Sequence, residues 1–267
     1  MSAVPLDVVP LWALFLALVA ASLLIDEYGF RFGRRRAGHA EKESDAIVGS
    51  MVAAELGLLA FLLAFTFGIG ASRFEMRRQI MLDETNAIGT TYLRAAMLPT
   101  AERDDVRRLL KEYVDVRIGA AMGTPLDEVI RRSETIHEQL WTDAVIAAAQ
   151  DERSVPVGLF VQSLNEVIDL HAKRVTAVIR SRMPLVVWGV LFAVALLSFL
   201  AMGYQAGLTR ANRSPAVVLI ALTFAAVIWL VADLDRPGQG LLRVTQQPMI
   251  DLRNSMDDKP SSSARLP

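Results

Sequence analysis

The sequence alternates between long apolar runs and longer polar stretches. Four runs, at residues 8–25, 47–71, 184–206 and 216–232, are long enough to cross about 30 Å of hydrocarbon as helices that rise about 1.5 Å per residue. The first run follows Asp7 and ends in acidic residues, whereas a cleaved signal has a basic start and a small-residue end, so we expect a membrane span there. The pattern predicts an all-α integral membrane protein with four transmembrane helices.

The stretch between the second and third runs is polar but keeps a helical period. Apolar residues recur every three or four positions along 106–118 and 129–147. Prolines interrupt the pattern at 98–100, 123–125 and 154–156. We therefore predict several helices outside the membrane, each with an apolar face to bury against another helix.

These observations divide the chain into four parts. Residues 1–71 would hold the first two spans with their basic connecting loop, residues 72–183 a helical extramembrane domain, and residues 184–236 the last two spans. Residues 237–267 end in SMDDKPSSSARLP, whose Ser, Asp and Pro content favours a disordered tail.

Composition agrees with a membrane protein and argues against several other classes. Hydrophobic residues make up 53% of the chain and charged residues 21%, and the formal net charge is −1, so no basic excess indicates nucleic acid binding. The chain has no cysteine, which excludes disulfides and cysteine-based metal sites. The three histidines, His39, His137 and His171, are far apart in the sequence and lack paired ligand spacing, so we expect no metal and no cofactor.

Basic residues beside the spans do not favour one orientation. A basic first loop favours a cytoplasmic loop and a helical domain on the opposite side of the membrane; its members are Arg31, Arg34, Arg35, Arg36 and Lys42. Basic residues at the ends of the helical domain favour the reverse: Arg73, Arg77, Arg78, Lys173, Arg174, Arg180 and Arg182. The two counts nearly balance.

The second run contains the residues that most suggest a permeation path. Glu55 is its one ionisable residue, and carboxylates inside spans usually face protein or water. Because Glu55 is near the start of the span, the alternatives are a protonated side chain or a pair with a loop arginine. Gly57, Phe61 and Phe65 recur at i, i+4 and i+8 and share one helix face. Such a stripe is more often simple packing or a lipid face, but around a pore apolar rings can gate by dewetting.

Polar residues gather just beyond the second and fourth spans. One hypothesis is a network at the base of the membrane domain, and the alternative is a solvated helix face with weak exposed ion pairs. Two carboxylates end the fourth span, where the helix dipole disfavours them, which indicates a cationic partner such as the adjacent arginine. The network would comprise Arg73, Glu75, Glu84, Asn86, Asp233, Asp235 and Arg236.

No motif indicates an enzyme. A phosphate loop, a dinucleotide-binding glycine pattern and a GxSxG elbow are all absent from the sequence. Its Ser, His and Asp residues form no arrangement that nominates a catalytic triad. We therefore predict that the chain has no catalytic residues.

Two stretches resemble a known family. FLLAFTFGIGASRFEMRRQIMLDETNAIGTTYLRAAMLP, from Phe61, and DLDRPGQGLLRVTQQPMIDL, from Asp233, are similar to the bacterial bestrophin-like membrane proteins, and the resemblance covers about residues 47–252. That family is distantly similar to the bestrophins, which are pentameric anion channels with four spans per subunit, cytoplasmic termini and a helical cytosolic domain continuing from the second span. The resemblance implies a homo-oligomer in the bacterial inner membrane whose helical domain is cytoplasmic.

The resemblance also implies that the second span lines a pore. In bestrophins three apolar residues at i, i+4 and i+8 form a neck, and the stripe described above matches those positions. The first member of the stripe is a glycine here, and Arg73-Phe74 stands where an Arg-Trp pair is usual. The acidic run that binds calcium in animal bestrophins is reduced to Asp233 and Asp235. We therefore carry over no calcium site.

Three functional hypotheses follow. The leading one is an oligomeric channel, most simply a pentamer, that passes small ions along an axis lined by the second span. The alternative is a non-conducting membrane protein whose helices at 72–183 dock a partner. The third is an ion-coupled transporter that uses Glu55.

Overall fold

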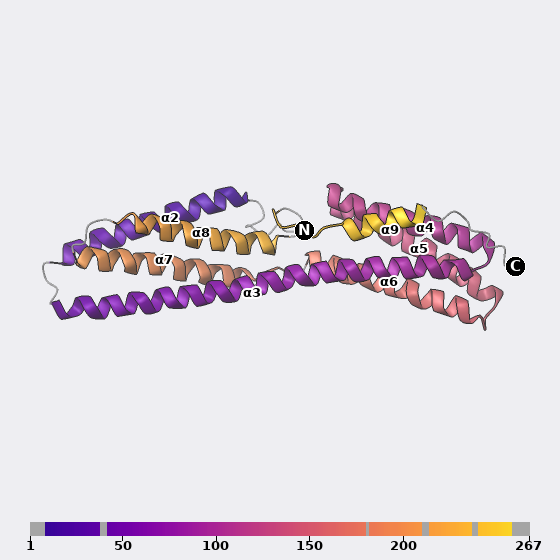
Figure 1. Ribbon diagram of the computed structural model, residues 1–267, viewed down its shortest axis with the longest axis horizontal. Helices are drawn as coiled ribbons and strands as arrows, with labels where there is room; N and C mark the ends of the chain where they lie inside the picture. The colour runs from indigo at the N-terminus through magenta and orange to yellow at the C-terminus, as the bar shows by residue number, and fades with distance from the viewer. Residues whose placement is uncertain (1–8, 38–41, 180–181, 210–213, 237–239, 258–267) are drawn as a thin grey trace. The chain divides into compact units, whose positions relative to one another are not determined.

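The computed structural model describes residues 9–37, 42–179, 182–209, 214–236 and 240–257 (Figure 1). All regular structure among these residues is helical, which confirms the predicted all-α class. The elements are α2 (Leu11–Arg36), α3 (Lys42–Arg94), the short 3₁₀ helix η1 (Ala95–Met97), α4 (Thr100–Met122), α5 (Leu126–Gln150), α6 (Val155–Ile179), α7 (Leu185–Leu208), α8 (Ala216–Asp235) and α9 (Gln247–Asp257).

The chain forms two compact units, and each has its own core. Unit 1 comprises Met1–Phe74 and Arg182–Arg243, and unit 2 comprises Glu75–Ser181 and Val244–Pro267. Unit 1 contains α2, the first part of α3, α7 and α8. Unit 2 contains the rest of α3 together with η1, α4, α5, α6 and α9.

Within the described ranges, four helices are long and apolar enough to cross a membrane, namely α2, α3, α7 and α8. The four predicted spans are therefore confirmed, although some helices continue past them. α2 extends from the predicted end at residue 25 to Arg36, where an ion pair between Glu27 and Arg31 and a basic last turn favour the added turns. α3 has 53 residues, more than twice the roughly 20 that a crossing needs.

Glycines allow α2 and α7 to touch backbone to backbone. A Cβ atom added to Gly29 or Gly33 of α2 would lie 2.3 or 2.2 Å from a backbone oxygen of α7, and one added to Gly203 or Gly207 of α7 would lie 2.1 or 2.3 Å from a backbone oxygen of α2. Each helix carries its pair at i and i+4, which is the small-residue spacing of close helix contacts in membranes. These four positions therefore tolerate no side chain.

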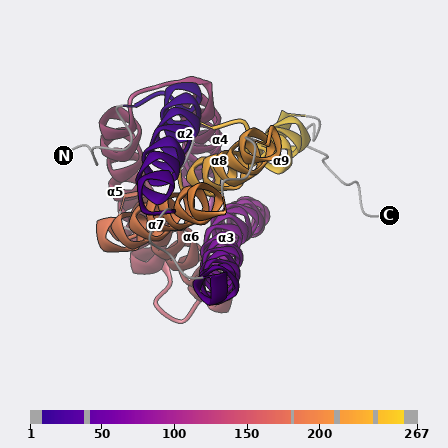
Figure 2. The same ribbon diagram turned by 90° about the vertical axis from the view of Figure 1, so that its left-hand side faces the viewer.

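The core of unit 1 joins all four of its helices. Figures 1 and 2 show α7 between α2 and α3. Leu59 and Leu63 of α3 are buried with Leu191 of α7 and Ile228 of α8. Yet only 17% of the apolar window of α3 is buried within the chain. Most of this helix therefore has its apolar surface available for lipid or for another protein surface.

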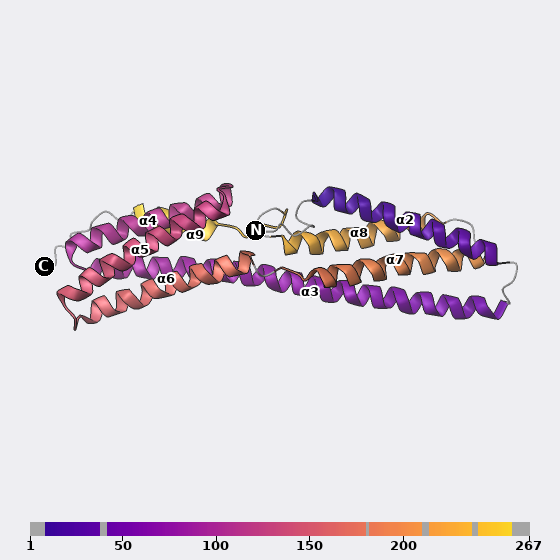
Figure 3. The ribbon, with the colours of Figure 1, turned by 180° about the vertical axis from the view of Figure 1, so that it is seen from behind.

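Unit 2 is held by amphipathic helices around a conventional apolar core (Figure 3). The predicted stripes form the buried faces of α4 and α5, including Leu110 and Leu140, which have no exposed surface. Complete burial of one such leucine stabilises the fold by roughly 1.5–3 kcal/mol. The predicted breaks coincide with helix ends, and Gly123 closes α4 in the left-handed region at φ 108°.

The C-terminal segment differs from its prediction. Residues 247–257 form α9, whereas we expected disorder from residue 237, so that prediction was wrong for these residues. Met249 and Met256, seven residues apart, are buried in the core of unit 2, and the Tyr92 hydroxyl donates a 3.2 Å hydrogen bond to the Met256 carbonyl oxygen. Two apolar residues on one face are enough to hold α9 on unit 2 because the surrounding core covers both side chains. The last part of the predicted tail, 258–267, lies outside the described residues.

Candidate functional site

The predicted stripe of α3 lies on the face turned away from the core of unit 1. Phe61 is 66% exposed and Phe65 60%, and a Cβ atom added to Gly57 or Gly68 would meet nothing within 4 Å. These four residues lie at i, i+4, i+8 and i+11 and so form one continuous face, which we call the α3 stripe. A single chain leaves this face uncovered among its described residues.

Glu55 does not belong to the α3 stripe. It precedes Leu59 by one turn and therefore lies on the side of α3 that is turned toward the core, about 200° around the helix from Gly57. The side chain is half-buried, and no described residue forms a hydrogen bond or ion pair with it. The structure thus separates the two features that the sequence placed together as pore candidates.

The two carboxylates at the end of α8 both accept hydrogen bonds from backbone amides. Asp233 is 1% exposed and accepts hydrogen bonds from the N–H groups of Leu241 and Leu242, at 2.8 and 2.9 Å. Asp235 accepts the N–H of Met183 at 3.0 Å and lies 3.8 Å from Arg73. Backbone amides thus provide donors to both carboxylates, where the sequence analysis expected a cation such as the adjacent arginine.

Of the remaining members of the predicted network, Arg236 lies with these carboxylates, whereas Glu75 and Asn86 lie on an exposed helix face. Arg236 is buried beside the carboxylates of α8 in unit 1. Glu75 makes an exposed i, i+3 pair with Arg78 at 2.9 Å, and Asn86 is exposed. Both therefore fit the alternative of a solvated helix face.

Glu84 lies at the centre of a polar cluster inside unit 2. Its carboxylate has no exposed surface, accepts a 2.6 Å hydrogen bond from the Tyr113 hydroxyl, lies 3.2 Å from Arg117 and forms an ion pair with Arg174. Burial raises the pKa of Glu84, but the two guanidinium groups and these hydrogen bonds outweigh it, so the pKa is below its ordinary value. Glu84 is therefore ionised at neutral pH.

Two histidines complete the cluster. The rings of His137 on α5 and His171 on α6 have centroids 5.0 Å apart, and His171 Nδ1 lies 3.3 Å from the Tyr113 hydroxyl oxygen. Burial, together with the neighbouring His171 for His137 and with Arg117 for His171, lowers the pKa of each histidine to about 4. Both imidazoles are neutral at pH 7. The sequence signal that was missed is that each lies on the buried stripe of its helix, where a polar residue needs a partner.

The family comparison decides the identity of the fold. A family model described as "Bestrophin-like domain" matches residues 11–249. This chain belongs to the bestrophin-like family. Together with its four apolar helices, that membership makes it an integral membrane protein that resides in a lipid bilayer. No curated protein has a matching sequence.

Solved structures share the fold of this bestrophin-like chain at low sequence identity. Two single-residue variants of a bacterial bestrophin homologue from Klebsiella pneumoniae align with TM-scores of 0.60 and 0.61 at 15% and 14% identity, covering 91% and 92% of this chain and 95% and 96% of theirs. A further crystal structure, described as a variant of a membrane protein, aligns at TM-score 0.57 and 17% identity over 91% of this chain and 94% of that one. The likeness concerns the fold over nearly the full length of both chains.

Proposed function

We propose that this bestrophin-like protein forms a closed homo-oligomer, most simply a pentamer, and that small ions pass along an axis lined by α3. The observation that carries the proposal is the α3 stripe, an apolar face with no partner among the described residues of its own chain. Lipid could cover such a face. Gly57 and Gly68, however, lie on either side of the two phenylalanines on this face, so the bulky side chains are confined to a short zone, as a constriction in a pore requires.

The two phenylalanines of the α3 stripe would set the narrowest apolar zone. Repeated around a ring of subunits, Phe61 and Phe65 would form two adjacent hydrophobic rings one helical turn apart. Constrictions of this kind control ion passage through the cost of removing water. Glycine at position 57 would leave the next turn wide. Anion selectivity is the family expectation and enters this proposal by analogy.

The first test joins oligomeric state to flux. The detergent-purified protein is examined by mass photometry, then reconstituted into vesicles for chloride efflux. We expect a ring of defined size, and we expect Phe61→Ala or Phe65→Ala to raise efflux several-fold by widening the constriction. Phe67→Ala is the matched control, because Phe67 is also exposed on α3 but lies about 200° around the helix from Phe65. A monomer without flux would overturn the proposal.

We place the protein in the bacterial inner membrane with unit 2 in the cytoplasm. The flanking charges nearly balance, and the family resemblance favours this orientation. The absence of cysteine from the chain makes the test direct, because Met122→Cys introduces a single thiol at a residue of unit 2 that is 79% exposed. A membrane-impermeant maleimide should label this thiol only after the cells are permeabilised. Labelling of intact spheroplasts would reverse the orientation.

A further inference from the structure

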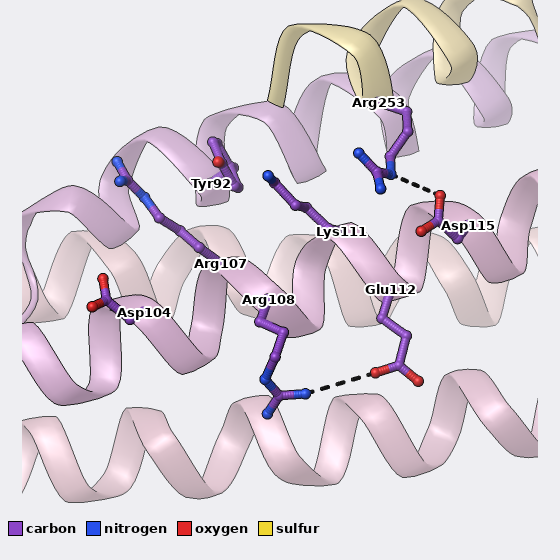
Figure 4. Close-up of a pocket in the computed structure, with 8 residues that line it drawn as sticks. All are labelled: Tyr92, Asp104, Arg107, Arg108, Lys111, Glu112, Asp115 and Arg253. Carbon is purple, nitrogen blue, oxygen red and sulfur yellow. Dashed lines mark hydrogen bonds and ion pairs between the residues drawn. The ribbon is translucent and has the colours of Figure 1, made fainter. Parts of the chain in front are cut away.

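A pocket of about 540 Å³ lies on unit 2, between α4, α9 and the end of α3 (Figure 4). Its volume is within the range of small-molecule sites and is much larger than a single monatomic ion needs. Tyr92 of α3 and Arg253 of α9 contribute to its wall. The other lining residues lie along successive turns of α4, and Figure 4 shows the side chains of Arg107 and Lys111 pointing to the same side of this helix, with Tyr92 and Arg253.

Most charges in this pocket already have a partner. Arg253 pairs with Asp115 at 2.7 Å, Lys111 with Asp257 at 2.9 Å, and Arg108 with Glu112 at 3.9 Å. Four of the lining residues are cations and three are carboxylates, and Asp257, which pairs with Lys111, brings the carboxylates at this wall to four.

Arg107 is the lining cation that has no ion pair among the described residues. Its guanidinium carbon lies 5.1 Å from the centroid of the Tyr92 ring, and its Nε is buried without a hydrogen-bond partner. No carboxylate oxygen of the described residues lies within 4 Å of it. The ring holds the guanidinium in place as a cation–π partner but supplies no acceptor for its donors. Arg107 is thus pre-positioned for an acceptor that comes from outside the chain.

We propose that this pocket binds the phosphate group of a small organic phosphate, with Arg107 as the primary contact and Lys111 as the second. The planar guanidinium of Arg107 can donate two hydrogen bonds to two oxygens of a phosphate group. The ammonium group of Lys111, one turn further along α4, adds a second positive charge. The carboxylates of Asp104 and Glu112 also line the pocket and can accept hydrogen bonds from hydroxyl or amino groups of the same ligand. A simple halide would use none of these acceptors.

The test measures thermal stabilisation of the full-length protein in detergent by inorganic pyrophosphate, against sodium chloride of equal ionic strength. We expect a saturable rise in Tm for the wild type, since a ligand that binds only the folded state stabilises it. Arg107→Gln should weaken the apparent affinity by about tenfold or more, the effect of removing one charged hydrogen-bond donor. Arg131→Gln, an exposed arginine of α5 outside the pocket, is the matched control and should leave the affinity unchanged.

Two further variants keep the test decisive. Arg107→Lys retains the charge without the planar fork and should fall between wild type and Arg107→Gln, which also covers the case that the glutamine variant does not fold. Lys111→Gln should cost less than Arg107→Gln. No saturable rise in the wild type, or equal affinity in wild type and Arg107→Gln, overturns the proposal.

The phosphate could come from a soluble metabolite or from a lipid headgroup, and nanodiscs distinguish these sources. Pyrophosphate affinity that is equal in discs of phosphatidylcholine and in discs that also contain phosphatidic acid identifies a soluble ligand. Competition by phosphatidic acid that is lost in Arg107→Gln identifies a headgroup. Both results support the oxyanion site, which does not depend on ion conduction.

Discussion

Unit 1 and unit 2 are both helical, but different contacts hold them together. In unit 1 the helices approach through glycines, and apolar surface remains exposed on α3. In unit 2 amphipathic helices bury their apolar faces, with a largely buried ion cluster among them. In lipid, the hydrophobic effect does not favour packing one apolar surface against another, so unit 1 depends on close backbone contact. Unit 2 is stabilised by burying apolar surface away from water, as in water-soluble proteins.

The largest expected effect tests the glycine contact of unit 1. Gly203→Leu places a side chain where a Cβ atom already lies 2.1 Å from the backbone oxygen of Asp26. Because backbone atoms cannot move aside, α2 and α7 must separate, and we expect loss of the folded, monodisperse protein. Size-exclusion chromatography of the detergent extract reports this. Gly189→Leu on the same helix, where nothing lies within 4 Å, is the control and should behave as wild type.

The next effect tests the buried cluster of unit 2. Glu84→Ala leaves the guanidinium groups of Arg117 and Arg174 buried without their shared carboxylate. Removing one partner of a buried pair costs about 3–5 kcal/mol. Hydrogen exchange should therefore accelerate in α4–α6 but not in α7 or α8. Faster exchange in both units alike would mean that they do not respond separately.

A smaller effect is the dependence of the stability of unit 2 on pH. His137 and His171 have pKa values of about 4 in the folded protein and an ordinary value of 6.5, so the unfolded chain binds more protons between these limits. Stability should be constant above about pH 7 and fall as the pH drops from there toward 4. Over this range the free energy of unfolding falls by on the order of 3 kcal/mol per imidazole. Thermal unfolding across this range measures it.

The control for this pH dependence removes both imidazoles. The double variant His137→Gln, His171→Gln should show a flatter profile between pH 7 and 4, whatever its absolute stability. The depressed pKa of Glu84 also contributes, but at lower pH, where its carboxylate becomes protonated. A double variant with the slope of the wild type would assign the pH dependence to other groups.

The smallest effect concerns the solvated face of α3. Glu75→Gln removes an exposed pair with Arg78, and such pairs contribute about 0–1 kcal/mol. We expect no measurable change in Tm. A drop of the size expected for Glu84→Ala would show that Glu75 has a partner beyond this chain.

Features that depend on local periodicity could be predicted from the sequence. The four spans follow from the length of their apolar runs, and the helix breaks follow from proline and Gly123. α9 was missed because an eleven-residue helix with two buried methionines has little periodic signal of its own. Its order depends on a core made by residues between Ala87 and Leu170, far earlier in the chain.

The contacts of the polar sites could not be predicted from the sequence either. The sequence indicated that Asp233 needs a partner, but its hydrogen bonds with the backbone amides of Leu241 and Leu242, eight and nine residues further along, depend on the tertiary fold. His137 and His171 meet only because α5 and α6 pack side by side. Contacts of this kind depend on tertiary packing, which residue spacing within one helix does not encode.

The position of α9 in the chain has a consequence for the order of synthesis. Its buried methionines are synthesised after α7 and α8, while the core that they fill is built from residues 75–181. Unit 2 therefore emerges with an open apolar face and closes only after the last two spans have been made. The folding of unit 2 is thus coupled to the synthesis of both spans that separate its two chain segments.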